Sequence, residues 1–397
     1  MQVSVIRSAE HWDACASDWN RLANNNPMLR HEWLGAWWRH YGDGHELHIL
    51  AVTDGDTAVG FVPCYVHRGR LGTQIRFLGS GAVCSDYLTA IVDPLRREPT
   101  LTAIHEYLVD QFQANRFGGS CLGFHLDGCT ETDPWTMSLV ELARTHGFSR
   151  RTITHFNAWR FQIPSTLAEF YGQRRGRNSH RKAKKAITRF QSGELVATHL
   201  TDPADLDHGM ATLRRLHQAR RASLGDSGCF ADPRFEPFLR DAVGQMIAVN
   251  AAKFLILEHQ SRAIGIHLQL IAPGTLMMYQ SGADPAWMSL EPGHALVTAA
   301  VLWSLEHGIR NFDFLRGDEP YKEFWGGIPE PIVHHTLAPP SIKAQSIESL
   351  QRGITRIRSG AKGLSSLFAL PDNRHSATTP TPPSGSGATV GHDDVSV

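Results

Sequence analysis

The residues best placed to do chemistry follow a short apolar segment at 311–315. Directly after it come two acids, Asp318 and Glu319, and then Tyr321 and Lys322. Moving an acyl group from a thioester to an amine or alcohol needs a base, an acid for the leaving thiolate, and positive charge near the oxyanion. We predict Asp318 or Glu319 as the base, Tyr321 as the acid and Lys322 as the positive charge. An exposed loop with ion pairs has the same composition.

A second stretch, 277–296, has the pattern of an anion-binding helix start. A strand ends in a loop of glycine, aspartate and proline, and a helix then begins at Pro292 and Gly293. Proline fits the first helical turn because it has no N–H to leave unpaired, and glycine lets a phosphate approach the backbone. The free N–H groups and the helix dipole favour an anion there. An ordinary helix start has the same pattern, but the following parallel strand favours a phosphate-bearing cofactor.

The elements that must position these stretches occur twice along the chain. In the first half we expect strands at 3–7, 46–52, 57–66, 74–78, 87–92 and 120–126, and a helix at about 100–115. In the second half we expect helices at 204–221, 237–250 and 293–307, and strands at 253–258, 263–271, 275–281 and 311–315. Ala58-Val59-Gly60-Phe61 and Ala263-Ile264-Gly265-Ile266 fall in matching hairpins. The repeated order predicts two similar α/β domains with mixed sheets flanked by helices.

Tryptophans are frequent near the start of the chain. Trp33 and Trp37, and Leu34 and Trp38, stand four residues apart, which places each pair on one helical face. We interpret this region, with Trp12 and Trp19, as core packing rather than a ligand site.

A basic segment, 174–189, contains eight lysines or arginines and no acid. Such a run is typical of a solvated helix face. It is equally suited to a polyanion, such as a nucleotide-linked sugar, a coenzyme phosphate, an anionic membrane surface or RNA.

The composition limits the classes of partner. The 397 residues carry 39 basic and 39 acidic side chains, so we expect no dedicated DNA binding. The sequence has no run of about 18 apolar residues, so it predicts no transmembrane segment, and no secretory signal is apparent. We therefore expect a cytoplasmic protein, or one peripheral to the inner face of the membrane. Six cysteines without CxxC spacing predict neither disulfides nor a metal site.

The predicted organisation has five parts. They are an N-terminal domain (1–160), a basic helical linker (161–200), a C-terminal domain (201–340), an amphipathic helix (341–370) and a disordered tail (371–397).

Taken together, the motifs resemble the CelD-like, cellulose-biosynthesis-associated branch of the GNAT acyltransferase superfamily. The resemblance rests on Asp284-Pro285, Pro292-Gly293, the run from Phe312 to Glu319, Tyr321-Lys322 and Trp325, and it spans about residues 3–325. Asn26 to Leu29, the tryptophan-rich helix and the basic segment support it.

This resemblance implies tandem GNAT-like domains, of which the second binds acetyl-CoA or another acyl-CoA. Gln280, Ser281 and Gly282 would line the pantetheine arm, and Pro292, Gly293, His294, Ala295 and Leu296 would hold the pyrophosphate. Arg316 and Trp325 would contact the acceptor, a small molecule or a saccharide. Unlike the usual glycine-rich GNAT loop, 291–296 has one glycine, and Glu291 places an anion beside the expected phosphates.

Two alternatives remain open. The FemAB-like peptidyltransferases share the duplicated fold and use aminoacyl-tRNA, which the basic segment would contact. A non-catalytic scaffold of a polysaccharide-synthesis complex would need neither donor.

Overall fold

The computed structural model describes residues 1–23, 25–69, 72–114, 121–173 and 177–340. All of them fall in one compact unit, Met1–Glu348. The predicted amphipathic helix (341–370) and tail (371–397) lie outside the described residues. The other predicted domain boundaries stay predictions.

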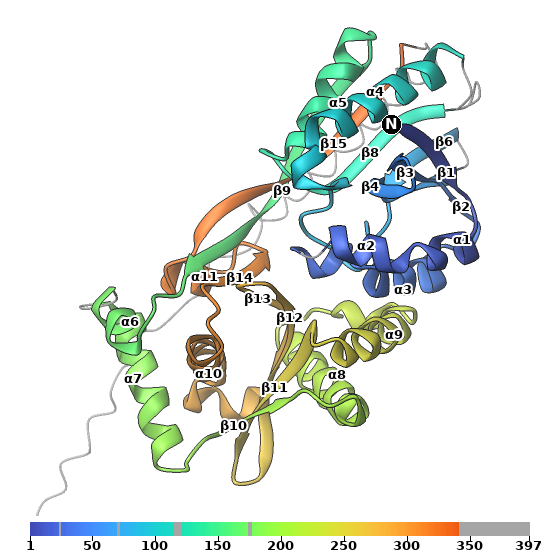
Figure 1. Ribbon diagram of the computed structural model, residues 1–397. Helices are drawn as coiled ribbons and strands as arrows, with labels where there is room; N and C mark the ends of the chain where they lie inside the picture. The colour runs from blue at the N-terminus through green and yellow to red at the C-terminus, as the bar shows by residue number, and fades with distance from the viewer. Residues whose placement is uncertain (24, 70–71, 115–120, 174–176, 341–397) are drawn as a thin grey trace, which may run out of the picture. The chain divides into compact units, whose positions relative to one another are not determined.

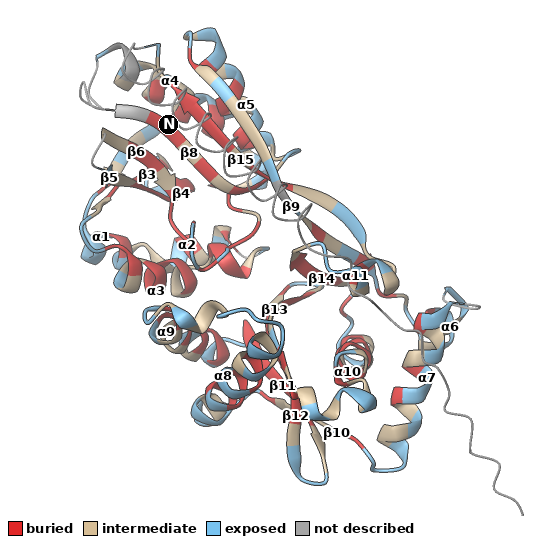
Figure 2. Cartoon of the chain, turned by 180° about the vertical axis from the view of Figure 1, so that it is seen from behind, coloured by how far each residue is buried: buried red, intermediate tan, exposed pale blue. Residues whose placement is uncertain are grey.

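The second half of the chain forms a sheet with helices on both faces (Figure 1). Its strands are β10 (Val196–Leu200), β11 (Ala252–His259), β12 (Arg262–Ala272), β13 (Thr275–Ala283) and β14 (Asn311–Arg316). The first four pair antiparallel in this order, and β14 joins β13 in parallel. One face carries α8 (Leu206–Ser223) and α9 (Phe235–Ala248), and the other carries α10 (Pro292–Glu306). In Figure 2, β11, β12 and α10 are largely buried, because their mostly apolar residues pack between these layers.

The first half repeats much of this order. Its strands are β1 (Gln2–Ile6), β2 (Glu46–Leu47), β3 (Ile49–Asp54), β4 (Thr57–Val62), β5 (Cys64–Gly69), β6 (Gly72–Phe77), β7 (Ile91–Val92) and β8 (Cys121–Thr130). Its helices are α1 (Ala9–Ala14), α2 (Ala16–Leu22), α3 (His31–Tyr41), α4 (Arg97–Gln113) and α5 (Pro134–Thr145). The matching tetrapeptides lie in β4 and β12, each the second strand of a hairpin, and β6 pairs with β8 in parallel as β13 does with β14. The prediction of two similar halves is confirmed.

Short helices connect the strands and helices of both halves. They are the 3-10 turns η1 (Pro27–Leu29), η2 (Pro94–Arg96), η3 (Pro203–Asp205), η4 (Cys229–Ala231) and η5 (Pro285–Leu290), and the α-helices α6 (Leu167–Gln173), α7 (Asn178–Gln191) and α11 (Pro320–Phe324).

Three of the expected strands differ from the structure. The strand expected at 46–52 is divided at His48 into β2 and β3, which belong to different sheets. The strand expected at 57–66 is divided at Pro63 into β4 and β5, which belong to different sheets. Proline has no N–H for the ladder, so the pairing of a strand is interrupted there. The strand expected at 87–92 is reduced to Ile91–Val92, because Tyr87 has a φ of 60°, outside the extended region.

Two long strands, β9 (Ser149–Gln162) and β15 (Ile328–Ala338), join the halves. β9 follows α5 in the first half but pairs with β14 of the second. β15 follows α11 in the second half but pairs with β8 of the first. The two strands also pair with each other, from Ser149 opposite Ala338 to Arg160 opposite Ile328. Each half therefore supplies a strand to the sheet of the other.

The tryptophans of the first half are core residues, as predicted. Trp12, Trp19, Trp33 and Trp37 are buried. Trp33 on α3 contacts Phe238 of α9 and Tyr279 of β13, with ring centroids 5.0 and 4.9 Å apart. The apolar core is therefore continuous between the halves.

Across the described ranges, the structure contains no helix with the length and apolar character needed to cross a bilayer.

Candidate functional site

The parallel strands β13 and β14 separate partway along their length. They pair over Thr275–Met277 and Asn311–Asp313, and Met277 opposite Asp313 is the last pair. Beyond it β13 continues to Ala283 beside β12, and β14 continues to Arg316. Tyr279 is an extra residue in the β12–β13 ladder, a bulge that bends β13 at this point. The resemblance predicted an acyl-CoA site in this half of the chain.

A cavity of about 540 Å³ lies beside the separated part of β13. It is lined mainly by residues of β13, α8, α10 and the short α11, together with His267 of β12 and Met288 of η5. The predicted site residues among them are Ser281, Gly282, Gly293, His294, Leu296, Glu319, Tyr321 and Trp325. The structure therefore brings most of the predicted cofactor-side residues to one cavity together with two of the predicted catalytic residues.

Helix α8 contributes cavity residues that the sequence analysis missed. They are His217, Arg220, Arg221 and Leu224, whose spacing places them on one helical face. This spacing is visible in the sequence, but many helix faces share it, so it did not single out a site. The two arginines add positive charge at a cavity that would receive phosphates.

Gly282 has a packing role that its position in the sequence does not reveal. A Cβ atom there would lie 2.5 Å from the backbone nitrogen of His217 and 2.7 Å from the carbonyl carbon of Leu216. Glycine at this place lets α8 approach β13 closely enough to form the cavity wall.

The N-terminus of α10 faces the cavity with Gly293. The N–H groups of His294 and Ala295 donate to the carbonyl of Glu291, at 3.0 and 3.1 Å. The N–H of Gly293, in the same first turn, does not donate to this carbonyl. A Cβ on Gly293 would meet no atom within 4 Å. Pro292 and Ala295 are buried beneath this turn and do not line the cavity, and neither does Gln280.

The basic segment packs against the start of α10. The Glu291 carboxylate pairs with Lys182, and also with Lys185 at 3.2 Å, both on α7. Arg189 donates to the carbonyl of Leu290 at 2.7 Å. The anion that the sequence placed beside the expected phosphates is therefore paired with two lysines, and α7 lies next to the cavity.

Tyr321 and Glu319 reach the cavity from α11. Burial raises the pKa of the Tyr321 hydroxyl, and the neighbouring Glu319 carboxylate raises it further. The Tyr321 hydroxyl therefore carries its proton at neutral pH.

Lys322 lies away from the cavity lining, with 2% of its residue surface exposed. Its Nζ donates to the carbonyls of Leu315, Arg316 and Gly317 at 3.0, 2.7 and 3.0 Å, and it pairs with Glu319 at 3.0 Å. Leu315 and Gly317 have φ angles of 56° and 115°, so this ammonium group fixes an unusual backbone path at the end of β14. Its role near an oxyanion stays a prediction.

Asp318 and Arg316 also point away from the cavity. Asp318 accepts hydrogen bonds from Asn157 and Trp159 of β9, at 2.8 and 3.1 Å, and the first of these is the largest cause of its lowered pKa. Arg316 Nε donates to the buried Asp86 of the first half at 2.5 Å. These two predicted site residues instead bond to the first half, and no finding tests their chemical roles.

The described residues contain no cluster of three or more histidine, cysteine or acidic side chains that could hold a metal ion.

Comparison with known proteins supports the fold. Residues 174–323 match the family described as the acetyltransferase (GNAT) domain. No curated protein matches the sequence of this chain.

Solved structures resemble nearly the whole described chain. FemX covers 88% of this chain and 99% of its own, with a TM-score of 0.62 and 12% identity. A conserved protein of unknown function from Bacteroides thetaiotaomicron covers 85% and 100%, with a TM-score of 0.53 and 9% identity. A domain assigned to a lysylphosphatidylglycerol synthetase of Agrobacterium fabrum covers 87% and 97%, with a TM-score of 0.51 and 9% identity. The chain has a mixed α/β fold with tandem GNAT-like halves, as predicted, and the second half carries the matched GNAT domain.

Proposed function

We propose that this protein is an acyltransferase that moves an acetyl or other acyl group from acyl-CoA to an amine or hydroxyl acceptor. One observation carries the proposal: Gly293, at the start of α10, and Tyr321 line the same cavity beside the separated strands β13 and β14. The match of residues 174–323 to the GNAT domain supports the same chemistry.

In this proposal the cofactor lies along the cavity from α10 to α11. The Gly293 N–H, the positive end of the α10 dipole and the guanidinium groups of Arg220 and Arg221 would receive the diphosphate. The backbone of Ser281 and Gly282 would line the pantetheine arm, and the thioester would lie near Tyr321. Pairing of Glu291 with Lys182 and Lys185 reduces the repulsion that this carboxylate would otherwise exert on the phosphates.

Tyr321 would protonate the sulfur that leaves when the thioester bond breaks. The hydroxyl is protonated at neutral pH and lines the cavity. Trp325 would shield the acyl group, since it is buried and lines the cavity.

The CelD-like resemblance implies a reaction in exopolysaccharide or cell-envelope biosynthesis, and we include this role in the proposal. Under this proposal the acceptor is a sugar or a sugar-bearing precursor.

A second candidate donor is aminoacyl-tRNA, which the FemAB-like resemblance implies. The position of α7 favours it, because Arg181 and Lys184 are exposed on a basic helix that packs against α10 beside the cavity. The structural similarity to FemX covers 88% of the chain and agrees with this alternative.

Ligand-dependent thermal unfolding distinguishes the candidates. A ligand at 100 times its dissociation constant adds about 2.7 kcal/mol of apparent stability. We expect acetyl-CoA and free CoA to raise the melting temperature of the full chain. No shift with either ligand would contradict the acyl-CoA proposal and favour the tRNA-dependent or scaffold alternative.

The Gly293→Val substitution tests where the cofactor lies. Because a side chain at Gly293 would enter open space in the cavity, we expect at least a tenfold loss of CoA affinity with little loss of stability. Gly172→Val is the matched control, since Gly172 is also a helical glycine with no neighbour within 4 Å of a built Cβ, but lies on α6. Unchanged CoA affinity in Gly293→Val would refute this placement.

A further inference from the structure

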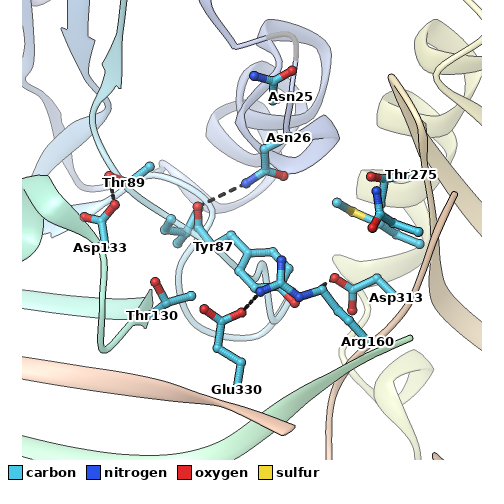
Figure 3. A pocket seen from close by; sticks show the side chains of 13 residues that line it. Asn25, Asn26, Tyr87, Thr89, Thr130, Asp133, Arg160, Thr275, Asp313 and Glu330 are labelled. Atoms are coloured by element: carbon cyan, nitrogen blue, oxygen red, sulfur yellow. Dashed lines mark hydrogen bonds and ion pairs between the residues drawn. The ribbon is translucent and has the colours of Figure 1, made fainter. Parts of the chain in front are cut away.

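A second pocket is lined in part by Thr275 and Met277 of β13 and by Asn311 and Asp313 of β14 (Figure 3). It has a volume of about 360 Å³, within the range of small-molecule sites. Met277 and Asp313, the last paired residues of the two strands, line this pocket, whereas the next residue, Met278, lines the cavity described above. Successive side chains of a strand point to opposite faces, so the pocket and the cavity flank the point where the strands separate.

Carboxylates outnumber cationic side chains in this pocket. Asp133, Asp313 and Glu330 line it, and Arg160 is the one Lys or Arg among its described lining residues. Arg160 pairs with Glu330. Asp133 accepts hydrogen bonds from Thr89 and Thr136, and Asp313 also accepts hydrogen bonds, so these two carboxyl groups have donors but no ion-pair partner among the described residues. Amide and hydroxyl groups complete much of the lining: Asn25, Asn26, Thr89, Thr130, Thr275 and Asn311. The pocket therefore suits a cationic ligand that also bears several hydroxyl groups.

Asp313 lies at the centre of the arrangement, with 1% of its surface exposed. Its Oδ2 accepts a hydrogen bond from the Tyr87 hydroxyl at 2.7 Å, and its Oδ1 accepts one from the Leu315 N–H at 2.7 Å. In Figure 3 the side chains of Tyr87 and Arg160 lie beside this carboxyl group. The Arg160 guanidinium lies over the Tyr87 ring, 5.3 Å from its centroid.

Burial raises the pKa of Asp313 to about 7. The Tyr87 hydroxyl, the Leu315 N–H and Arg160 oppose this rise, and Asp86 adds to it. A carboxyl group with this pKa exchanges a proton readily near neutral pH, as a general base must.

Both donors to Asp313 come from residues with a strained backbone. Tyr87 and Leu315 have φ angles of 60° and 56°, in the left-handed region that such side chains rarely adopt. Other contacts hold both residues there. Asn26 donates to the carbonyl of Tyr87 at 3.0 Å, and Lys322 donates to that of Leu315 at 3.0 Å. Backbone strain of this kind is typical of functional sites, where the surrounding structure maintains it.

We infer that this pocket binds the acceptor, a hydroxylated primary amine of the amino-sugar class, and that Asp313 takes the proton from its nitrogen. This inference rests on the proposed acyl transfer and specifies its second substrate. The acceptor would reach the thioester from the face opposite to the cofactor, where β13 and β14 no longer pair.

The reaction balances as follows. The amine nitrogen forms a bond to the thioester carbonyl carbon, and the carbon–sulfur bond breaks, with its electron pair leaving on sulfur. The acceptor binds as an ammonium ion, so its nitrogen loses two protons. The first goes to Asp313 and on to solvent before the attack, and the second goes to Asp313 as the amide forms. The thiolate takes the proton of Tyr321. Solvent then restores the two side chains, and the products are an amide and a free thiol.

Calorimetric titration of the full chain with D-glucosamine and D-glucose tests the inference. We expect glucosamine to bind at least tenfold more tightly than glucose, because only the amine pairs with the carboxylates. Asp313→Asn and Asp133→Asn should each weaken glucosamine binding about tenfold or more. Asparagine at 133 still caps α5, as Asp133 does, so this variant keeps its helix. Asp110→Asn, a change of an exposed acid on α4, is the matched control and should bind as the wild type does.

Thr275→Tyr adds a test that leaves Asp313 intact. The larger side chain should fill the pocket from β13 and abolish glucosamine binding, while the acetyl-CoA shift on the other face stays. Three results would each overturn the inference. They are equal binding of glucosamine and glucose, no glucosamine binding, and wild-type glucosamine affinity in Thr275→Tyr. Glucosamine binding that these variants reduce, without any acetyl-CoA shift, would support the pocket and contradict the proposed donor instead.

Discussion

Lys322 shows how far a residue's neighbours in space decide its role. In the sequence it follows Tyr321 and looks like a free positive charge at a strand end. In the structure it is buried, and its ammonium group donates to three backbone carbonyls. It acts as a clamp on the end of β14, and through Leu315 it helps to position Asp313.

Replacing Lys322 should therefore lower the stability of the folded protein. We expect Lys322→Met to lower the free energy of unfolding by about 2–4 kcal/mol, because three buried carbonyls lose a charged donor. Urea denaturation measures the change. Lys184→Met, at an exposed position on α7, should change stability by less than about 0.5 kcal/mol. Wild-type stability of Lys322→Met would show that the clamp is not needed for the fold.

The pH dependence of the reaction separates two candidate bases. A protonated carboxyl group cannot accept a proton, and the pKa of Asp313 is about 7. We therefore expect kcat/KM, expressed per concentration of neutral amine acceptor, to rise about tenfold per pH unit below pH 7 and to level off above it. Asp318 has a lowered pKa and stays ionised over this range. If Asp318 were the base, this rise would be missing, and its presence in Asp318→Asn would exclude that residue.

At the residue scale, the sequence could predict the cavity side of the site but not the pocket. Gly293 and Tyr321 belong to short motifs, so neighbouring residues in the sequence are enough to suggest a role for them. Asp313 contacts Tyr87, which is 226 positions away, and nothing near either residue predicts that pairing. Asp318 and Glu319 are adjacent acids in the sequence, yet only Glu319 reaches the cavity, since Asn157 and Trp159 hold Asp318 elsewhere.

Among the elements, β11 contains a buried lysine that should lower the free energy of unfolding at neutral pH. Lys253 has no exposed surface, and its Nζ lies over the Trp303 ring without a hydrogen-bond partner among the described residues. Burial lowers its pKa to about 6. Between pH 6 and the usual lysine pKa of about 10.4, the unfolded chain binds more protons, so stability rises with pH.

Lys253→Met should accordingly stabilise the protein at pH 7. We expect a gain of about 2–4 kcal/mol, which shrinks as the pH approaches 10. Chemical denaturation of both proteins at pH 7 and pH 9.5 measures it. Equal stabilities at pH 7 would mean that β11 accommodates the lysine without cost.

Elements with a clear apolar pattern were predicted well, and others were not. The strands β11 to β14 and the helix α10 lie close to their predicted bounds, because continuous apolar runs mark buried elements. The strands β9 and β15 were missed. β9 contains many polar and charged residues. β15 has Pro329 and Pro331 near its start, and prolines in a sequence argue against predicting a strand there. Pairing with the other half outweighs these local preferences.

For the whole molecule, the exchange of β9 and β15 makes the halves depend on each other. Expressed alone, residues 1–163 would lack the β15 neighbour of β8, and residues 164–397 would lack the β9 neighbour of β14. We expect each fragment to aggregate and the two co-expressed fragments to form a soluble complex, because unpaired strand edges associate. Size-exclusion chromatography distinguishes these results. A monomeric, cooperatively folded fragment of either kind would show that the halves are independent.

The same exchange affects how the chain folds as it is made. Ser149 pairs with Ala338, about 190 residues further along. At a synthesis rate of roughly 5–20 residues per second, β8 and β9 emerge from the ribosome about 10–40 s before β15 can pair with them. During that interval the nascent first half presents an open strand edge, which is prone to associate with other chains until β15 pairs with it.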